Sequence, residues 1–185
     1  MNLQARMNKA FDDYFAVTNK LRSDVDLFLD VIESGLINAS DIRWKRNFVR
    51  TLVAVIEGHS YMLRQIAATE LECKHQELSK KEQKALTSGD DFSIPERIKH
   101  TLSGSYKVFG LPPPDFGTPD WENAREGLDW RNDLMHPKTP ADLERASDSW
   151  KRIDSGLIWL LKQHFDFMQH LHEWNTKNSG LVVPG

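Results

Sequence analysis

The spacing of apolar side chains near the C-terminus constrains the fold of this chain most strongly. Positions there recur at alternating steps of three and four residues, which on an α-helix places them on one side. The spacing predicts a long final helix from about Pro140 to Trp174. Additional apolar residues widen this face, so we expect the helix to pack on two neighbours, inside a bundle and across a dimer. The repeat comprises Leu143, Ala146, Trp150, Ile153, Leu157, Leu160, His164, Phe167 and Leu171, and the widening residues are Trp159, Leu161, Phe165 and Met168.

The same helical period runs through most of the remaining sequence. It predicts a first helical stretch, one helix or two nearly collinear ones, from Met7 to a glycine cap near Ser34–Gly35. A second long helix begins at Ser40 or Asp41 and ends at about Gln76. Shorter helices follow the capping residues Ser79, Ser93 and Thr118, and the first of these ends at Gly89. No strand-type alternation exceeds four residues, so we predict an all-α fold. The predicted fold is a single antiparallel helical bundle over residues 1–175, with long first, second and last helices and shorter helices between them. Residues 176–185 are predicted to form a flexible tail.

Composition restricts the class of protein. The chain has 185 residues, of which 39% are apolar and 28% charged, which suits one globular domain and excludes a disordered or membrane-embedded chain. The N-terminus lacks the apolar core of a signal peptide, and the single cysteine, Cys73, excludes a disulfide framework. We therefore expect a cytoplasmic protein without a membrane partner. The net charge of -3 argues against a uniformly basic nucleic-acid-binding surface, although it permits a locally basic site.

Searches for common catalytic and metal-binding motifs find none. The sequence has no His-Glu-x-x-His pattern, no glycine-rich phosphate loop and no Gly-x-Ser-x-Gly elbow. A carboxylate-bundle metallohydrolase would need repeated Glu-x-x-His pairs, and none is present. We therefore expect no metal and no cofactor. His59, His75, His100 and His164 lack suitably spaced ligand partners and are interpreted as surface or hydrogen-bonded core residues.

One constellation stands out, the segment Asp129-Trp130-Arg131-Asn132-Asp133-Leu134-Met135-His136-Pro137-Lys138. Arg131 falls on the same side of its predicted helix as Trp121 and Leu128, which should face the interior. A guanidinium stays charged there and needs acceptors. His136 falls at the end of the helix, because Pro137 disfavours a helical residue before it.

This segment resembles the signature of the HEPN superfamily, an arginine commonly followed by a polar residue and, a few residues later, a histidine. Arg131, Asn132 and His136 match that signature in type, in order and in their position before the last long helix. The resemblance in architecture covers most of residues 3–174. It implies metal-independent RNA cleavage by a toxin or an abortive-infection protein. It also implies a site formed where two copies of the motif meet in a homodimer, and an antitoxin protein as a partner.

The residue types suit that chemistry. Attack of a ribose 2′-hydroxyl on the adjacent phosphate needs a proton acceptor and donor near neutral pH, which His136 would supply. The guanidinium of Arg131 would stabilise the negative charge on the phosphoryl oxygens. Asn132 would orient the histidine or the phosphate.

Further residues are assigned supporting roles. Lys138, Arg46 and Arg50 are candidates for contacts with the RNA backbone. Glu57 is a candidate ion-pair partner of Arg131, and Asp133 a member of a surface ion pair.

A structural interpretation of the same residues stays open. Arg131 would then only anchor its helix, on Glu57 or on carboxylates of the final helix, and His136 would interact with the helix dipole. The second helix would present a solvated face with internal ion pairs, formed by Arg46, Arg50, Glu57 and Arg64. The alternative function is a non-catalytic HEPN-like dimerisation module that binds a partner protein or a nucleotide.

Overall fold

The computed structural model describes residues 3–34, 41–72, 77–88 and 91–179. Within these ranges the chain forms helices and no strand, which confirms the predicted all-α bundle with long first, second and last helices. The elements are α1 (Leu3–Glu33), α2 (Ile42–Leu71), α3 (Lys80–Thr87), α4 (Ile94–Val108), α5 (Pro119–Met135), the 3-10 helix η1 (Pro140–Leu143) and α6 (Ser147–Ser179).

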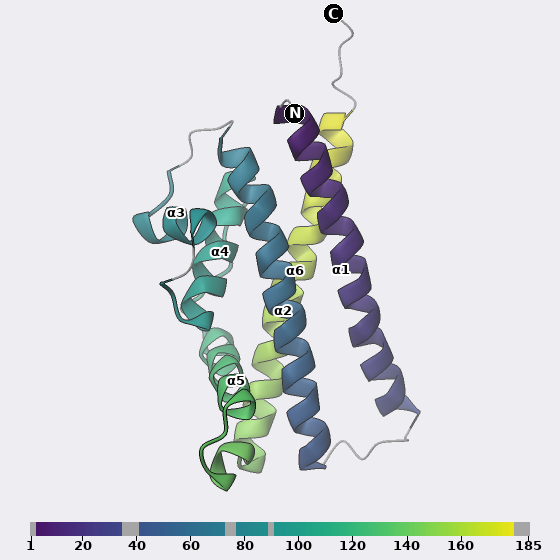
Figure 1. The fold of residues 1–185 in the computed structure, drawn as a ribbon, viewed down its shortest axis with the longest axis vertical. Coiled ribbons are helices and arrows are strands. Elements are labelled where there is room, and N and C mark those ends of the chain that lie inside the picture. The colour runs from purple at the N-terminus through teal and green to yellow at the C-terminus, as the bar shows by residue number, and fades with distance from the viewer. Residues whose placement is uncertain (1–2, 35–40, 73–76, 89–90, 180–185) are drawn as a thin grey trace, which may run out of the picture.

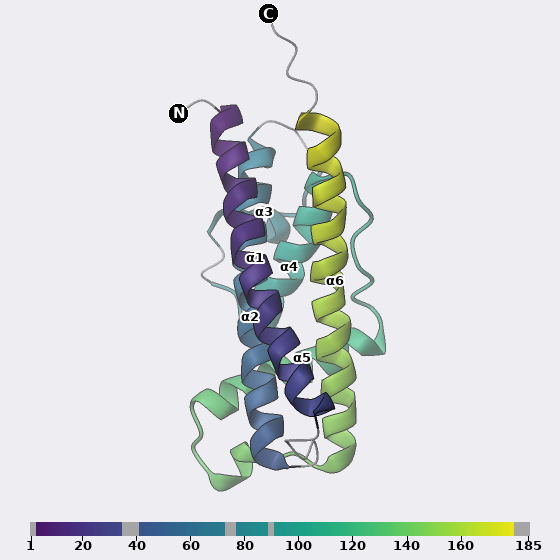
Figure 2. The same ribbon diagram turned by 90° about the vertical axis from the view of Figure 1, so that its right-hand side faces the viewer.

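Three long helices run the length of the molecule, and three shorter ones cover one side of it. Figure 1 shows α1 descending beside α2, while α3, α4 and α5 follow one another down the opposite side of α2. Figure 2 shows α1 and α6 at the front, with the start of α1 and the end of α6 at the same end of the bundle and the two helices converging toward the other end of α1. The end of α5 and the start of α6 lie at the opposite end of the bundle, so the motif is far from both chain ends.

Capping residues determine where the helices begin. The Asp41 carboxylate accepts the backbone N–H of Arg43 at 2.8 Å and starts α2, as predicted. Ser79 and Glu82 form a reciprocal capping box at the start of α3, and Ser93 caps α4. Helix α2 ends at Leu71, and the predicted end near Gln76 lies outside the described residues. The predicted ends at Gly35 and Gly89, and Cys73, lie outside the described residues.

The start of the final helix differs from the prediction. Residues 140–143 form η1, and α6 begins only at Ser147. The Asp142 carboxylate accepts the backbone N–H groups of Lys138 at 2.7 Å and Thr139 at 2.8 Å. Because these bonds hold Asp142 in a separate turn, the apolar repeat through Leu143 and Ala146 does not continue α6 toward the N-terminus. At the other end α6 extends to Ser179, so residues 176–179, which the prediction places in the tail, are helical.

The core forms where α6 meets its neighbours. The predicted seam of α6 is buried at Ile153, Leu157, Leu160, Phe167 and Leu171. Helices α5 and α6 approach very closely, because a Cβ added to Gly156 would overlap the backbone of Asn123 and Ala124. A Cβ on Gly127 would lie 2.9 Å from Cγ of Leu157. The position of α5, and therefore of the motif, is set by this contact with α6.

Candidate functional site

Arg131 lies on α5 and is held by a carboxylate of α2. Its Nη2 is 2.8 Å from Oε2 of Glu57, and Oε1 of the same carboxylate accepts a hydrogen bond from Nη2 of Arg97 on α4 at 3.2 Å. The side chains of Arg131 and Glu57 are 23% and 22% exposed. The structure therefore contains the Arg131–Glu57 pair anticipated from the sequence. We call the group of Arg97, Glu57 and Arg131 the Glu57 cluster. It carries one excess positive charge, because two guanidiniums share one carboxylate.

His136 occupies the C-cap of α5, just beyond its last helical residue. Its backbone N–H donates to the carbonyl of Asn132 at 3.1 Å, and the residue leaves the helix with φ -134° and ψ 56°. Both His136 and Asn132 are exposed. Among the described residues the imidazole of His136 has no hydrogen-bond partner and no contact with Arg131. The two principal motif residues thus differ, since the arginine is anchored and the histidine is open to solvent.

Arg50 ties α2 to the last turn of α5. Its Nη2 donates to the carbonyl of Leu134 at 2.9 Å, and its Nη1 donates to Oδ1 of Asn47 at 3.3 Å. Satisfying a terminal carbonyl with a cation stabilises the C-terminal end of a helix. Arg46 lies one turn earlier on α2 and is half-buried. Hydrogen bonds from Arg43, with a smaller Coulombic contribution from Arg46, lower the pKa of Asp41 to about 2.

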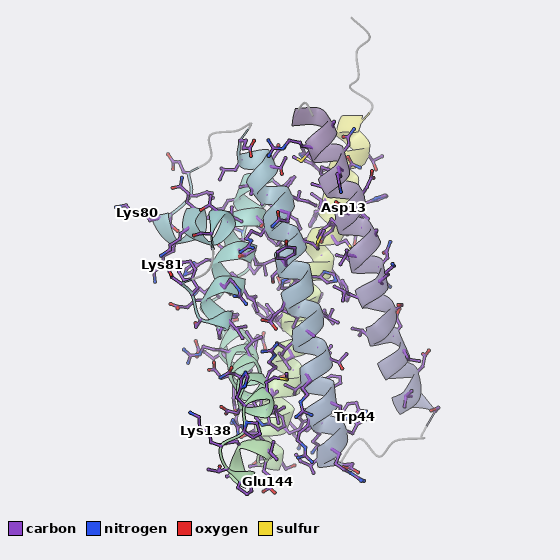
Figure 3. The ribbon with its side chains drawn as sticks, viewed as in Figure 1. Asp13, Trp44, Lys80, Lys81, Lys138 and Glu144 are labelled. Carbon is purple, nitrogen blue, oxygen red and sulfur yellow. The ribbon has the colours of Figure 1, made fainter. Side chains whose placement is uncertain are left out.

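The remaining predicted residues belong to the connection between α5 and α6. Asp133 accepts a hydrogen bond from Nη2 of Arg145 at 3.0 Å, and the guanidinium of Arg145 lies 5.4 Å from the ring centroid of Trp130. Lys138 is exposed in the turn beyond His136, and Figure 3 shows it with Glu144 at this end of the bundle. Lys138, Arg50 and His136 therefore lie around the same helix end, whereas Asp133 supports the turn.

A pocket that the sequence did not reveal lies beside the Glu57 cluster. This α2–α4 pocket has a volume of about 290 Å³. From the sequence, Arg64 is assigned only to a solvated face of the second helix, and neither Tyr61 nor Arg97 is singled out. The signal in the sequence that could have identified Arg97 is its four-residue spacing from Thr101, which places both side chains on one face of α4. Neither Arg131 nor His136 lines the pocket, whose lining residues are Glu57, Ser60, Tyr61, Arg64, Arg97, Ile98 and Thr101.

A buried histidine lies beneath this pocket. His164 of α6 has Nε2 at 2.9 Å from Oγ of Ser60 and Nδ1 at 2.9 Å from the carbonyl of Leu160. A carbonyl only accepts, so Nδ1 carries the proton and Nε2 accepts the hydroxyl proton of Ser60. Burial lowers the pKa of His164 to about 4, so its ring is neutral near pH 7. His164 is therefore a hydrogen-bonded core histidine, one of the two roles predicted for it from the sequence.

His59 departs from that interpretation. Its ring is fully buried between Tyr14 of α1 and His164 of α6, with ring centroids 6.4 and 6.1 Å away. Neither ring nitrogen has a hydrogen-bond partner among the described residues. Burial, with a smaller effect of His164, lowers the pKa of His59 to about 3. Hence His59 is a core residue, but not a hydrogen-bonded one.

A larger groove of about 1020 Å³ lies between α1 and α6. Leu161, Phe165 and Met168, three of the residues expected to widen the apolar face of the final helix, line it together with Phe15 and Val25 of α1. This groove does not include the motif.

No group of three or more His, Cys, Asp or Glu side chains in the described ranges is arranged to hold a metal ion. None of the helices described combines the length and apolar character needed to cross a bilayer. Comparisons with models of known protein families, with curated proteins and with solved structures found no match.

Proposed function

We propose that this protein is a metal-independent endoribonuclease of the HEPN kind, acting in the cytoplasm as a homodimer within a toxin–antitoxin or abortive-infection system. The motif at the end of α5, directly before the last long helix of an all-α bundle, supports this proposal. The observation that carries it is the difference between the two motif side chains. Arg131 is anchored in the Glu57 cluster, which has excess positive charge, while the imidazole of His136 is exposed on the same helix.

Each side chain then has a defined role. The guanidinium of Arg131, oriented by Glu57, stabilises the negative charge that develops on the phosphoryl oxygens. His136 accepts the proton of the attacking 2′-hydroxyl or donates a proton to the leaving oxygen, and either step requires access to solvent and substrate. Lys138 and Arg46 contact backbone phosphates beside the scissile bond, whereas Arg50 positions the last turn of α5 through the carbonyl of Leu134. Asn132, exposed on the last turn, orients the phosphate.

A second copy of the chain is part of this proposal. Arg131 points from α5 to Glu57 of α2, whereas His136 leaves the helix at its C-cap, and no hydrogen bond or ion pair joins the two side chains within one copy among the described residues. A partner related by two-fold symmetry brings its own motif opposite the first and completes the site.

Cleavage of RNA in EDTA by the purified protein tests the mechanism. His136→Ala should lower the rate by about two orders of magnitude or more, and Arg131→Ala by a similar factor. The matched controls are His170→Ala, an exposed histidine of α6, and Arg152→Ala, an exposed arginine paired with Glu126. Activity that survives both motif substitutions, or that depends on added metal, would contradict the proposal.

Mixing the two inactive variants tests the shared site. Random pairing of the two variants makes half of the dimers mixed. If each site takes Arg131 from one copy and His136 from the other, one of the two sites in every mixed dimer is intact. Activity should then recover to about a quarter of the unmutated value. A protein that cleaves RNA while it remains monomeric in light scattering would contradict the dimeric site.

The alternative function is a non-catalytic dimerisation module that binds a partner protein or a nucleotide. The 2.8 Å ion pair between Arg131 and Glu57 favours it, because a paired arginine also serves to anchor α5. This alternative predicts no cleavage by the unmutated protein, and a loss of stability rather than of activity in Arg131→Ala. The antitoxin is tested by co-expression with the protein of a neighbouring gene. That protein should relieve the growth arrest caused by the unmutated chain, whereas the His136→Ala chain should cause no growth arrest with or without it.

A further inference from the structure

The α2–α4 pocket combines two cations with only one carboxylate. Arg64 and Arg97 both line it, and Glu57 is the only acidic residue among the described residues that line it. Glu57 is already shared between Arg97 and Arg131, so it cannot neutralise every guanidinium. Arg64 donates to the carbonyl of Ser88 at 3.2 Å and has no carboxylate partner in the described part of the chain. Arg131 pairs with Glu57 from outside the pocket, so the two lining arginines together with this pair carry two excess positive charges, which matches the charge of a phosphate monoester near pH 7.

An aromatic ring borders the same pocket. Tyr61 is 56% exposed, although it is a large side chain at the centre of a long helix. The guanidinium of Arg64 lies 5.4 Å from its ring centroid, a cation–π contact that orients Arg64. An exposed ring beside a phosphate-binding cation provides a surface on which a nucleobase stacks.

The floor of the pocket offers an acceptor. Ser60 lines the pocket, and because its hydroxyl gives its proton to Nε2 of His164, its oxygen is left with lone pairs only. Such an oxygen accepts a hydrogen bond from a ribose hydroxyl or a base amino group. The volume of about 290 Å³ is at the lower end of the usual range for small-molecule sites and suits one nucleotide unit rather than a dinucleotide.

We propose that the α2–α4 pocket binds a mononucleotide, with Arg64 and Arg97 on its phosphate, Tyr61 against its base and Ser60 accepting from its sugar or base. The ligand is a free nucleoside monophosphate or the phosphorylated terminal nucleotide of an RNA, which present the same chemistry. The site is separate from His136 and does not depend on RNA cleavage.

Calorimetric titration of the His136→Ala protein tests the site without turnover of RNA. The probes are nucleoside 5′-monophosphates, the corresponding nucleosides and inorganic phosphate. A monophosphate should bind at least about tenfold more tightly than its nucleoside, because only the phosphate meets both arginines. It should also bind more tightly than inorganic phosphate, which cannot stack on Tyr61.

Substitutions then locate the binding. Arg64→Gln and Arg97→Gln should each weaken binding about tenfold or more, while Arg152→Gln, with the same charge change outside the pocket, should leave it unaltered. Tyr61→Ala should weaken binding about fivefold or more and Tyr61→Phe should not, because stacking needs the ring and not the hydroxyl. Circular dichroism confirms that each variant is folded.

A competition experiment distinguishes the two sources of the ligand. If a short 5′-phosphorylated RNA displaces the monophosphate and the same RNA without the phosphate does not, the pocket binds RNA ends. No displacement by either RNA assigns it to the free nucleotide. Equal binding of nucleoside and monophosphate, or unchanged affinity in both Arg64→Gln and Arg97→Gln, would overturn the proposal, whatever the outcome of the cleavage assay.

Discussion

The end of α5 and the α2–α4 pocket contain the same residue types in opposite arrangements. At the end of α5 the arginines have fixed acceptors, Arg131 on Glu57 and Arg50 on the carbonyl of Leu134, while the histidine of the region, His136, is exposed. In the α2–α4 pocket the histidine beneath the floor, His164, is sealed and neutral. Of the two arginines there, Arg97 shares Glu57 with Arg131, whereas Arg64 donates to the carbonyl of Ser88 and has no carboxylate partner among the described residues.

This difference separates two kinds of chemistry. A solvent-accessible imidazole beside an anchored cation suits proton transfer at a charged substrate. A guanidinium with unmatched charge above a neutral, hydrogen-bonded floor suits anion binding. Residue type alone therefore does not assign a role to an arginine or a histidine in this molecule.

The largest expected effect comes from Gly156→Ala, which disturbs one region and spares the other. A Cβ at this position would overlap the backbone of α5, so the helix must move, at a cost of about 3 kcal/mol or more in the free energy of unfolding. Cleavage should be lost with it, whereas nucleotide binding between α2 and α4 should persist in the folded fraction.

Gly58→Ala is the matched control for this measurement by denaturant unfolding. Its Cβ would meet Cδ1 of Leu21 at 2.8 Å, the far end of a side chain that can rotate away. A Gly156→Ala protein as stable as Gly58→Ala would show that the α5–α6 contact is looser than described.

The buried histidines should make stability depend on pH. The folded-state pKa values of His59 and His164, about 3 and 4, lie below the ordinary value of 6.5. The unfolded chain therefore binds more protons below pH 6.5, and stability falls as the pH falls. Each histidine should contribute a loss of about 1.5 kcal/mol between pH 6.5 and pH 5.

Urea unfolding of His59→Leu at both pH values measures this contribution. The variant should lose about 1.5 kcal/mol less than the unmutated protein over that interval. His170→Gln, which changes an exposed histidine, should show the unmutated dependence. An unchanged pH dependence in His59→Leu would mean that the ring is protonated in the folded protein.

Glu57→Gln removes the carboxylate that connects the two regions. We expect a modest loss of about 1 kcal/mol in the free energy of unfolding, because the ion pairs are only partly buried. The released positive charge should tighten nucleotide binding several-fold, which titration measures. Glu126→Gln, which frees Arg152 instead, should not change affinity. Weaker binding in Glu57→Gln would mean that Glu57 positions Arg97 for the ligand.

Arg50→Met should have the smallest effect. It removes the hydrogen bond to the carbonyl of Leu134 and should cost about 1 kcal/mol or less in thermal unfolding. The control is Arg125→Met, an exposed arginine of α5 that pairs with Glu122. Equal effects of the two substitutions would show that the bond to Leu134 adds no stability.

The sequence predicted the helices well because their apolar period is a local property. It also placed His136 at a helix end, since Pro137 acts on the residue directly before it. It did not predict η1, because two hydrogen bonds from Lys138 and Thr139 to Asp142 override an apolar repeat that continues through Leu143. Arg97 was not singled out because, unlike Arg131, it belongs to no motif in the sequence, and its hydrogen bond to Glu57 depends on how α4 packs on α2.

The glycine contact between α5 and α6 also has a mechanical consequence. With backbone against backbone at Gly156, no deformable layer of side chains separates the two helices there. A displacement of α6 along its axis is therefore transmitted to α5 with little slack. The same α6 forms one wall of the α1–α6 groove, so the exposed histidine at the end of α5 and that distant groove share one rigid support.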